Sequence, residues 1–223
     1  MQAGKDEQGH RKATEQEIGN TRLLAHIAQR FAKVLPGHEP FPTKFPKKRD
    51  PYQALVRAVV FQQLSGKAAN TIHTRMLALF PDVDHPEPQQ LVKAKPDLLR
   101  SAGLSRQKIA AIQDVAAKRL DGTIPEARAL ARMKDDEIIE RLTAARGVGR
   151  WTVEMYLIFT LGRPDVLPID DLGVRKGAEK LYRREFTPKT LGAYGERWGP
   201  FRSAAAWHLW RVMDTQTPEE SKK

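Results

Sequence analysis

Apolar side chains recur along the chain at spacings of three and four residues, the pattern of a helix that buries one face. Segments rich in proline and glycine separate these runs. No segment shows the sustained alternation of β-branched residues that is typical of a half-buried strand. We therefore predict an all-α protein, with helices at 23–35, 54–64, 68–80, 109–120, 153–161 and 204–212.

The breaks divide the predicted helices into two groups. We expect residues 52–164 to form a central helical lobe, and residues 15–51 together with 165–214 to form a terminal helical lobe, with a cleft between them. A chain of 223 residues is long enough for two closely packed lobes. Residues 1–14 and 215–223 are polar and poor in apolar side chains, so we expect flexible tails there.

The stretch Leu142–Thr152 contains two glycines, Gly147 and Gly149, between an amphipathic run and a second apolar run. It predicts a helix, a tight turn and a helix, with the acidic residues 135–137 in the first turn of the leading helix. Glycine accepts positive φ and lets a phosphate approach bare N–H groups at a helix start. An ordinary turn between helices needs only one such glycine, so the pair favours phosphate binding over simple chain reversal.

Two adjacent aspartates, Asp170 and Asp171, follow Pro168, and Asp171 lies twenty residues beyond Trp151. A carboxylate at the start of a helix accepts backbone N–H bonds, and one aspartate suffices for that role. We expect Asp170 to cap the helix and Asp171 to be available for chemistry. The alternative is that both residues only cap the helix.

The segment 61–67 ends one apolar run and begins the next, with Ser65 as the expected N-cap. Two glutamines beside an apolar run are unusual for pure packing, and a turn that presents Gln63 or Leu64 can fill the gap left in a duplex by an extruded nucleotide. Two interpretations are open for Trp151 and Trp210. They are either core residues or indoles that stack on a cationic base.

The formal net charge of +11 and the isoelectric point near 9.9 favour a polyanionic partner, although a solvated basic surface gives the same values. The sequence contains no cysteine, which excludes disulfides, thiolate zinc sites and a cysteine-ligated iron–sulfur cluster. The six histidines do not lie at metal-ligand spacing. No apolar run approaches the ~20 residues that span a bilayer, and the first residues are polar, so we expect no membrane association and a cytoplasmic location.

Four motifs in this order resemble those of the helix-hairpin-helix DNA glycosylases, and within them the DNA-3-methyladenine glycosylase II group. The resemblance covers residues 52–214 and implies a two-lobed helical fold. Because only 51 residues precede Tyr52, we expect no N-terminal β-domain of the kind that longer relatives carry. The motifs that carry the resemblance are the hairpin at 142–152, the aspartates at 168–172, the turn at 61–69 and the aromatic segment 197–210.

The resemblance also implies roles for individual residues. Asp171 matches the essential aspartate, and Trp151 stands where strand-cleaving relatives carry a Schiff-base lysine. Trp151, Met155 and Trp210 match positions that line the base pocket, although relatives can have a tyrosine at the position of Met155. The wedge that fills the duplex gap corresponds to Gln63, with Leu64 and Ser65 beside it.

At the hairpin, the resemblance implies that a DNA phosphate binds backbone N–H groups of Gly147, Gly149 and Thr152. A monovalent cation, Na⁺ or K⁺, would be held there by carbonyl groups, and no other cofactor is required. The iron–sulfur cluster of some relatives is absent, as the lack of cysteine requires. The carbonyl groups of the cation site belong to Thr143, Ala145 and Val148.

The expected function is that of a monofunctional DNA glycosylase of base excision repair, a monomer that acts at the nucleoid. It would flip bases such as 3-methyladenine and 7-methylguanine from double-stranded DNA and hydrolyse the N-glycosidic bond. One alternative is a non-enzymatic protein that binds damaged DNA through the hairpin. Another is a bifunctional glycosylase and lyase, which would need an amine such as that of Lys176 to reach the sugar.

Overall fold

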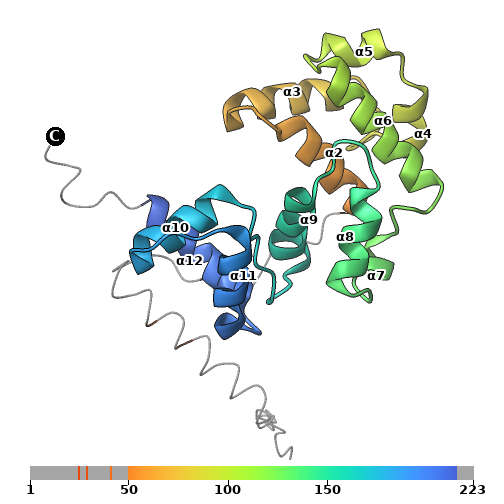
Figure 1. Ribbon diagram of the computed structural model, residues 1–223. Coiled ribbons are helices and arrows are strands. Elements are labelled where there is room, and N and C mark those ends of the chain that lie inside the picture. The colour runs from red at the N-terminus through yellow and green to blue at the C-terminus, as the bar shows by residue number, and fades with distance from the viewer. Residues whose placement is uncertain (1–24, 26–28, 30–40, 42–49, 215–223) are drawn as a thin grey trace, which may run out of the picture. The chain divides into compact units, whose positions relative to one another are not determined.

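The computed structural model describes residues 25, 29, 41 and 50–214, which contain helices and no strand (Figure 1). The prediction of an all-α protein is confirmed. The predicted helix at 23–35 lies almost entirely outside the described residues. No helix in the described part is long and apolar enough to cross a membrane.

The other five predicted helices are present, with bounds that differ by a few residues, and so are the leading helix of the hairpin and the helix after Pro168. The sequence pattern missed the helices at 88–93, 96–101, 127–130 and 188–195. A turn of π-helix and a turn of 3₁₀-helix extend two of the α-helices. The elements are α2 (Pro51–Phe61), α3 (Gly66–Ala78), α4 (Pro88–Lys93), α5 (Pro96–Ser101), α6 (Arg106–Leu120), α7 (Ala127–Leu130), α8 (Asp135–Thr143), α9 (Arg150–Tyr156), the π-helix η1 (Leu157–Leu161), α10 (Leu172–Tyr182), α11 (Pro188–Gly195), the 3₁₀-helix η2 (Glu196–Trp198) and α12 (Arg202–Asp214).

Local chemistry sets the bounds of α2. The helix spans residues 51–61, so each end lies three residues earlier than in the predicted range 54–64. The Asp50 carboxylate accepts the Tyr52 N–H at 2.9 Å, which starts the helix at Pro51. At the other end, Gln63 has a φ of +56°, a left-handed conformation that a helix cannot continue through. Ser65 caps α3 as predicted, because its hydroxyl accepts the Ala68 N–H at 3.4 Å.

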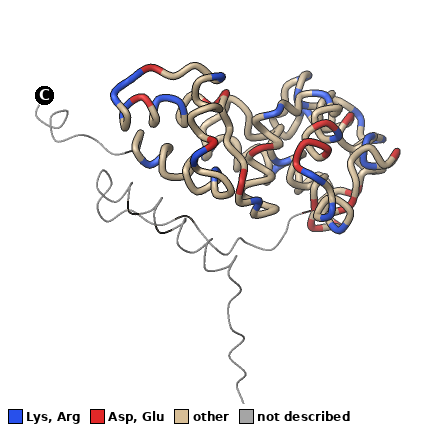
Figure 2. The backbone as a smooth tube through the Cα atoms, turned by 60° about the horizontal axis from the view of Figure 1, so that its bottom comes forward, with Lys and Arg blue, Asp and Glu red and all other residues tan. Residues whose placement is uncertain are grey.

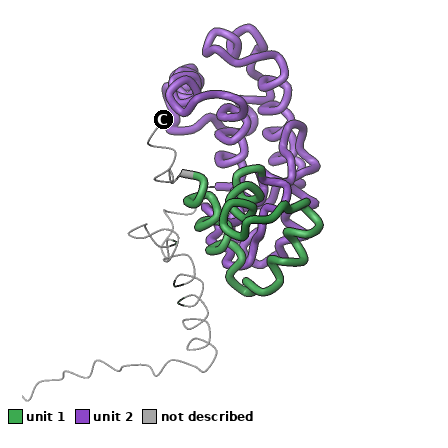
Figure 3. The backbone as a smooth tube through the Cα atoms, turned by 60° about the vertical axis from the view of Figure 1, so that its left-hand side comes forward, with its two compact units in different colours: residues 1–41, 172–223 green, residues 42–171 purple. Residues whose placement is uncertain are grey.

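By its internal contacts the chain divides into two compact units (Figure 3). One unit comprises residues 42–171, and the other comprises 1–41 and 172–223. The predicted lobes and the cleft between them stay a prediction.

The core of the unit 42–171 is built on the pair α2 and α6. Apolar residues at helical spacing are fully buried on both helices, as the periodicity predicts. The buried residues of this pair are Pro51, Tyr52, Leu55, Val56, Val59 and Val60 on α2, and Ile109, Ala111, Ile112, Val115 and Ala116 on α6.

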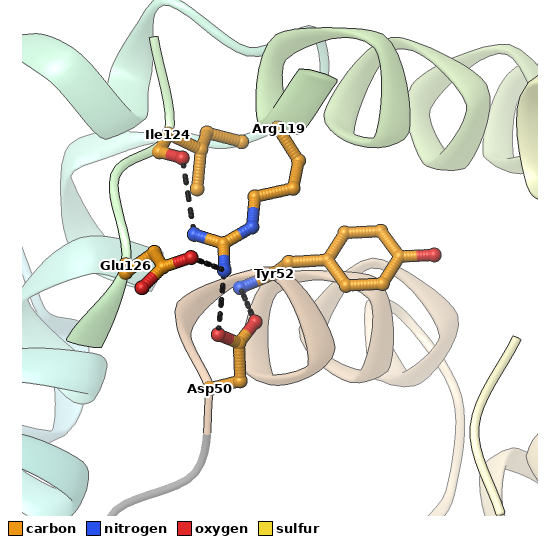
Figure 4. A network of polar contacts seen from close by, with 5 residues as sticks. All are labelled: Asp50, Tyr52, Arg119, Ile124 and Glu126. Carbon is orange, nitrogen blue, oxygen red and sulfur yellow. Dashed lines mark hydrogen bonds and ion pairs between the residues drawn. The ribbon is translucent and has the colours of Figure 1, made fainter. Parts of the chain in front are cut away.

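Polar contacts join α2 and α6 at both ends. Arg119 Nη2 lies 3.1 Å from Asp50 Oδ2, and Arg119 also donates to the Ile124 carbonyl at 3.3 Å (Figure 4). At the opposite end, Lys108 Nζ donates to the Val60 carbonyl at 2.7 Å. The start of α2 therefore meets the end of α6, and the two helices run antiparallel.

In the other unit, α10 packs closely against α12. Gly177 lies under the backbone of Leu209, and a Cβ atom at this glycine would run into the Leu209 carbonyl oxygen. Val174 and Ala178 are fully buried beside it on the same face of α10. The absence of a side chain at Gly177 is what allows these two helices to approach so closely.

We expect Gly177→Ala to lower the free energy of unfolding by about 1–3 kcal/mol, because the added methyl group meets backbone that cannot rotate away. Gly66→Ala is the matched control, since Gly66 also lies in a helix and a Cβ there meets nothing within 4 Å. Denaturant unfolding of both variants measures the difference. Equal stability of the two variants would contradict this account of the α10–α12 contact.

Candidate functional site

The predicted helix-hairpin-helix consists of α8, a turn at 144–149 and α9 (Figure 1). The acidic residues 135–137 occupy the first turn of α8, as predicted. Gly147 has a φ of +76°, so this glycine takes the left-handed conformation that the pattern predicted. Gly149 has an extended backbone with φ −89° and is the N-cap of α9, and a Cβ there would meet nothing within 4 Å.

The first backbone N–H that bonds back into α9 is that of Val153, which donates to the Gly149 carbonyl at 3.3 Å. The N–H groups that precede it in the first turn have no carbonyl partner within the helix. The first turn of α9 contains no acidic residue of its own. The assignment of Gly147, Gly149 and Thr152 to a phosphate stays a prediction.

Trp151 and Asp171 contact each other directly. Trp151 Nε1 donates to Asp171 Oδ2 at 2.6 Å, within the unit 42–171. The Trp151 side chain is 48% exposed, so the alternative of a core tryptophan is wrong. α10 begins at Leu172, so the residue directly before the helix is Asp171, and not Asp170, to which we assigned the cap.

Beside Trp151 the unit contains a pocket of about 530 Å³ between α2 on one side and α9 with η1 on the other. Trp151 and Met155, both predicted for the base pocket, line it one helical turn apart. The π-helical turn that follows contributes Phe159 and Thr160, and such turns are frequent at functional sites. The α2 side contributes Ala54, Leu55, Arg57, Ala58, Phe61, Gln62 and Gln63.

The turn between α2 and α3, residues 62–65, is presented to solvent at the rim of this pocket. The three residues predicted for the wedge, Gln63, Leu64 and Ser65, are exposed, and Leu64 is one of the large apolar side chains that the fold leaves uncovered. Gln62 Nε2 donates to the Gly147 carbonyl at 2.8 Å, so the α2–α3 turn contacts the hairpin turn.

Trp210 lies on α12 in the unit formed by 1–41 and 172–223, where it is half-buried. Its predicted role in the base pocket stays a prediction. Of the residues predicted to hold a cation, Thr143 is the last residue of α8, and Ala145 and Val148 belong to the hairpin turn. The described residues include no group of three or more His, Cys, Asp or Glu side chains that could hold a metal ion.

The sequence reasoning missed Glu154, a carboxylate on α9 that is only 3% exposed. Its Oε1 accepts a hydrogen bond from Arg150 Nε at 3.0 Å, and Arg150 itself is exposed. Burial raises the pKa of Glu154, and the nearby carboxylates of Asp170 and Asp171 raise this pKa further, while Arg150 opposes both effects. The only signal in the sequence was the four-residue spacing of Arg150 and Glu154 on one helix.

Basic residues are distributed along the helices of both units and are interspersed with acidic ones (Figure 2). The excess of 38 Lys and Arg over 27 Asp and Glu still gives the whole chain its net positive charge. This charge gives a general attraction for polyanions and does not by itself single out a binding surface.

We expect Glu154→Gln to stabilise the protein at neutral pH. The folded protein holds the Glu154 proton more tightly than the unfolded chain. The carboxyl group therefore costs no stability below its ordinary pKa of 4.5, and the cost grows as the pH rises from 4.5 to the raised pKa of the folded state and is constant above it. Glutamine is neutral and still accepts the Arg150 hydrogen bond. The melting temperature of the variant should exceed that of the wild type at about pH 7 and match it at about pH 4. A less stable variant at neutral pH would contradict this assignment.

Known proteins resemble this chain in sequence and in fold. The model of the HhH-GPD superfamily of base excision DNA repair proteins matches residues 56–200. The DNA-3-methyladenine glycosylase 1 of Schizosaccharomyces pombe is 38% identical over 87% of this chain and 87% of its own length. The DNA-3-methyladenine glycosylase 2 of Escherichia coli is 28% identical over 90% of this chain and 69% of its own length.

Among solved structures, a 3-methyladenine DNA glycosylase of Schizosaccharomyces pombe in complex with abasic DNA superimposes with a TM-score of 0.74 at 36% identity. The superposition covers 87% of this chain and 97% of the solved one. The resemblance found in the sequence motifs is therefore confirmed. The chain belongs to the HhH-GPD superfamily of base excision DNA repair proteins.

Proposed function

We propose that the protein is a monofunctional DNA glycosylase that removes alkylated bases of the 3-methyladenine and 7-methylguanine type from double-stranded DNA. The observation that carries the proposal is the 2.6 Å hydrogen bond between Trp151 and Asp171. It joins a carboxylate to an exposed indole that also lines a pocket, so a charged group and a stacking surface occur together. The names of the relatives support this class of substrate.

The reaction breaks the bond between C1′ of the sugar and the base nitrogen. The bond's electron pair leaves with the base, which is neutralised because alkylation had made it cationic. Positive charge then develops on the sugar, and the Asp171 carboxylate stabilises that charge more effectively in a water-poor site than it would in water. A water molecule adds its oxygen to C1′ and loses a proton, which leaves a free base and an abasic site.

The pocket beside Trp151 suits an extruded base. Trp151 and Met155 offer a flat and a polarizable apolar surface, which attract a cationic aromatic ring. The pocket lining is mostly apolar, so recognition would depend on stacking and on the weakened glycosidic bond more than on hydrogen-bond readout.

Strand cleavage is not expected, because it needs a neutral amine that attacks the sugar. The position of the Schiff-base lysine of lyases is held by Trp151. Lys176, the amine considered as an alternative, is engaged in an ion pair, with its Nζ 2.6 Å from Glu179 Oε2.

The hairpin would anchor the DNA through the backbone N–H groups of Gly147, Gly149 and Thr152. Backbone carbonyls are hard oxygen donors that suit Na⁺ or K⁺, and those of Thr143, Ala145 and Val148 come from one short stretch around the turn. A cation held there would add positive charge beside the bound phosphate. We further propose that the protein acts as a monomer on DNA in the cytoplasm.

Asp171→Asn tests the proposal, because it removes the charge with almost no change in shape. We expect release of 3-methyladenine and 7-methylguanine from methylated duplex DNA to fall by at least about 100-fold, with binding to an abasic-analogue duplex retained. Chromatography of the released bases and a gel-shift assay measure the two effects. Unchanged release would remove Asp171 from the mechanism.

Wild-type protein should also give no covalent adduct with damaged DNA under borohydride, since no imine forms. Trapping of such an adduct would instead support the bifunctional alternative. Tight binding to damaged DNA without release of any base by the wild type would support the non-enzymatic alternative.

A further inference from the structure

One face of α6 contacts both of the turns that are expected to touch DNA. Lys108, Ala111 and Asp114 follow one another at three-residue spacing, so they lie along the same side of the helix. Lys108 contacts the end of α2 and the α2–α3 turn, and Ala111 and Asp114 contact the hairpin turn. These three residues therefore hold both turns against the same helix, α6.

Lys108 fixes the beginning of the α2–α3 turn. Its Nζ donates to the carbonyl of Val60 at 2.7 Å and to the carbonyl of Gln62 at 2.9 Å. These carbonyls lie at the C-terminal end of α2, where helical partners run out and a cation is favourable. The next residue, Gln63, then turns the chain with its positive φ.

Asp114 and Ala111 fix the hairpin turn from the same face. Asp114 Oδ2 accepts the backbone N–H of Arg146 at 2.7 Å. A Cβ on Gly147 would lie only 3.0 Å from the Ala111 Cβ, so the hairpin backbone rests directly on α6. The glycine at 147 thus serves both the positive φ and this close approach.

Gln62 closes the arrangement. Its side-chain amide donates to the Gly147 carbonyl at 2.8 Å, while its own backbone carbonyl accepts from Lys108. Gln62 and Gly147 are 85 positions apart in the sequence. Their hydrogen bond links the two turns directly, without involving α6. Because the bond is exposed, it contributes little to overall stability, and its position favours a role in geometry.

We propose that Gln62 is a positioning residue that couples the hairpin turn to the α2–α3 turn, so that a phosphate bound at the hairpin sets where Gln63 and Leu64 enter the duplex. This inference rests on the proposed function. The hairpin alone supplies binding to any duplex, whereas insertion at the lesion depends on the coupling. Loss of the Gln62 amide should therefore reduce unstacking and excision more than it reduces affinity.

The test is Gln62→Met, which keeps the length of the side chain and removes the donor. Gln113→Met is the matched control, because the Gln113 amide also donates to backbone carbonyls, at 3.2 and 3.0 Å, but those carbonyls belong to Leu91 and Ala94 and to neither turn. Each variant is mixed with a duplex that carries an abasic analogue next to 2-aminopurine, whose fluorescence rises on unstacking. Affinity for this duplex and single-turnover excision of 7-methylguanine are measured in parallel.

We expect Gln62→Met to lower the fluorescence rise and the excision rate about five- to tenfold, with affinity within about twofold of the wild type. Gln113→Met should leave all three quantities unchanged. The proposal is overturned if Gln62→Met behaves like Gln113→Met, or if it loses affinity in proportion to excision. If the wild type releases no base, the proposed function fails, while the fluorescence rise still decides the coupling in the same way.

Discussion

The hydrogen bond from Trp151 Nε1 to Asp171 Oδ2 is the contact on which the proposed chemistry depends. Trp151 belongs to the helix that follows the hairpin, and Asp171 ends a proline-bounded loop twenty residues later. The bond fixes the carboxylate relative to the hairpin and to the pocket at the same time. A phosphate held at the hairpin would therefore place its neighbouring sugar at a defined distance from a defined charge, which is what charge stabilisation requires.

The scaffold beneath this contact is the antiparallel pair α2 and α6. Arg119 joins the helices at one end through Asp50, and Lys108 joins them at the other end through the Val60 carbonyl. The apolar faces between these contacts are fully buried, so the pair has little freedom to slide. The α2–α3 turn and the hairpin turn lie at one end of this pair, and their contacts with it restrict their motion.

Periodicity and caps predicted the helical class and the position of the hairpin, because these depend on neighbours in sequence. Ser65 and Gly147 behave as their residue types predict. The Gln62–Gly147 and Asp114–Arg146 bonds were not predictable, because they join segments brought together only by packing. The burial of Glu154 was not predictable for a related reason. On a helix as short as α9, burial of a side chain depends on which other segments pack over it. α10 begins one residue later than the assignment of its cap to Asp170 implies, since helix starts are poorly defined by sequence.

The most direct measurement is single-turnover excision of 7-methylguanine by Trp151→Phe, which keeps an aromatic surface and loses the N–H that holds Asp171. The account predicts that excision slows by at least about tenfold while affinity for an abasic-analogue duplex stays within about twofold, because the variant loses the hydrogen bond to a charged group and keeps an aromatic ring. Excision at the wild-type rate would show that Asp171 does not need Trp151, and would contradict the account.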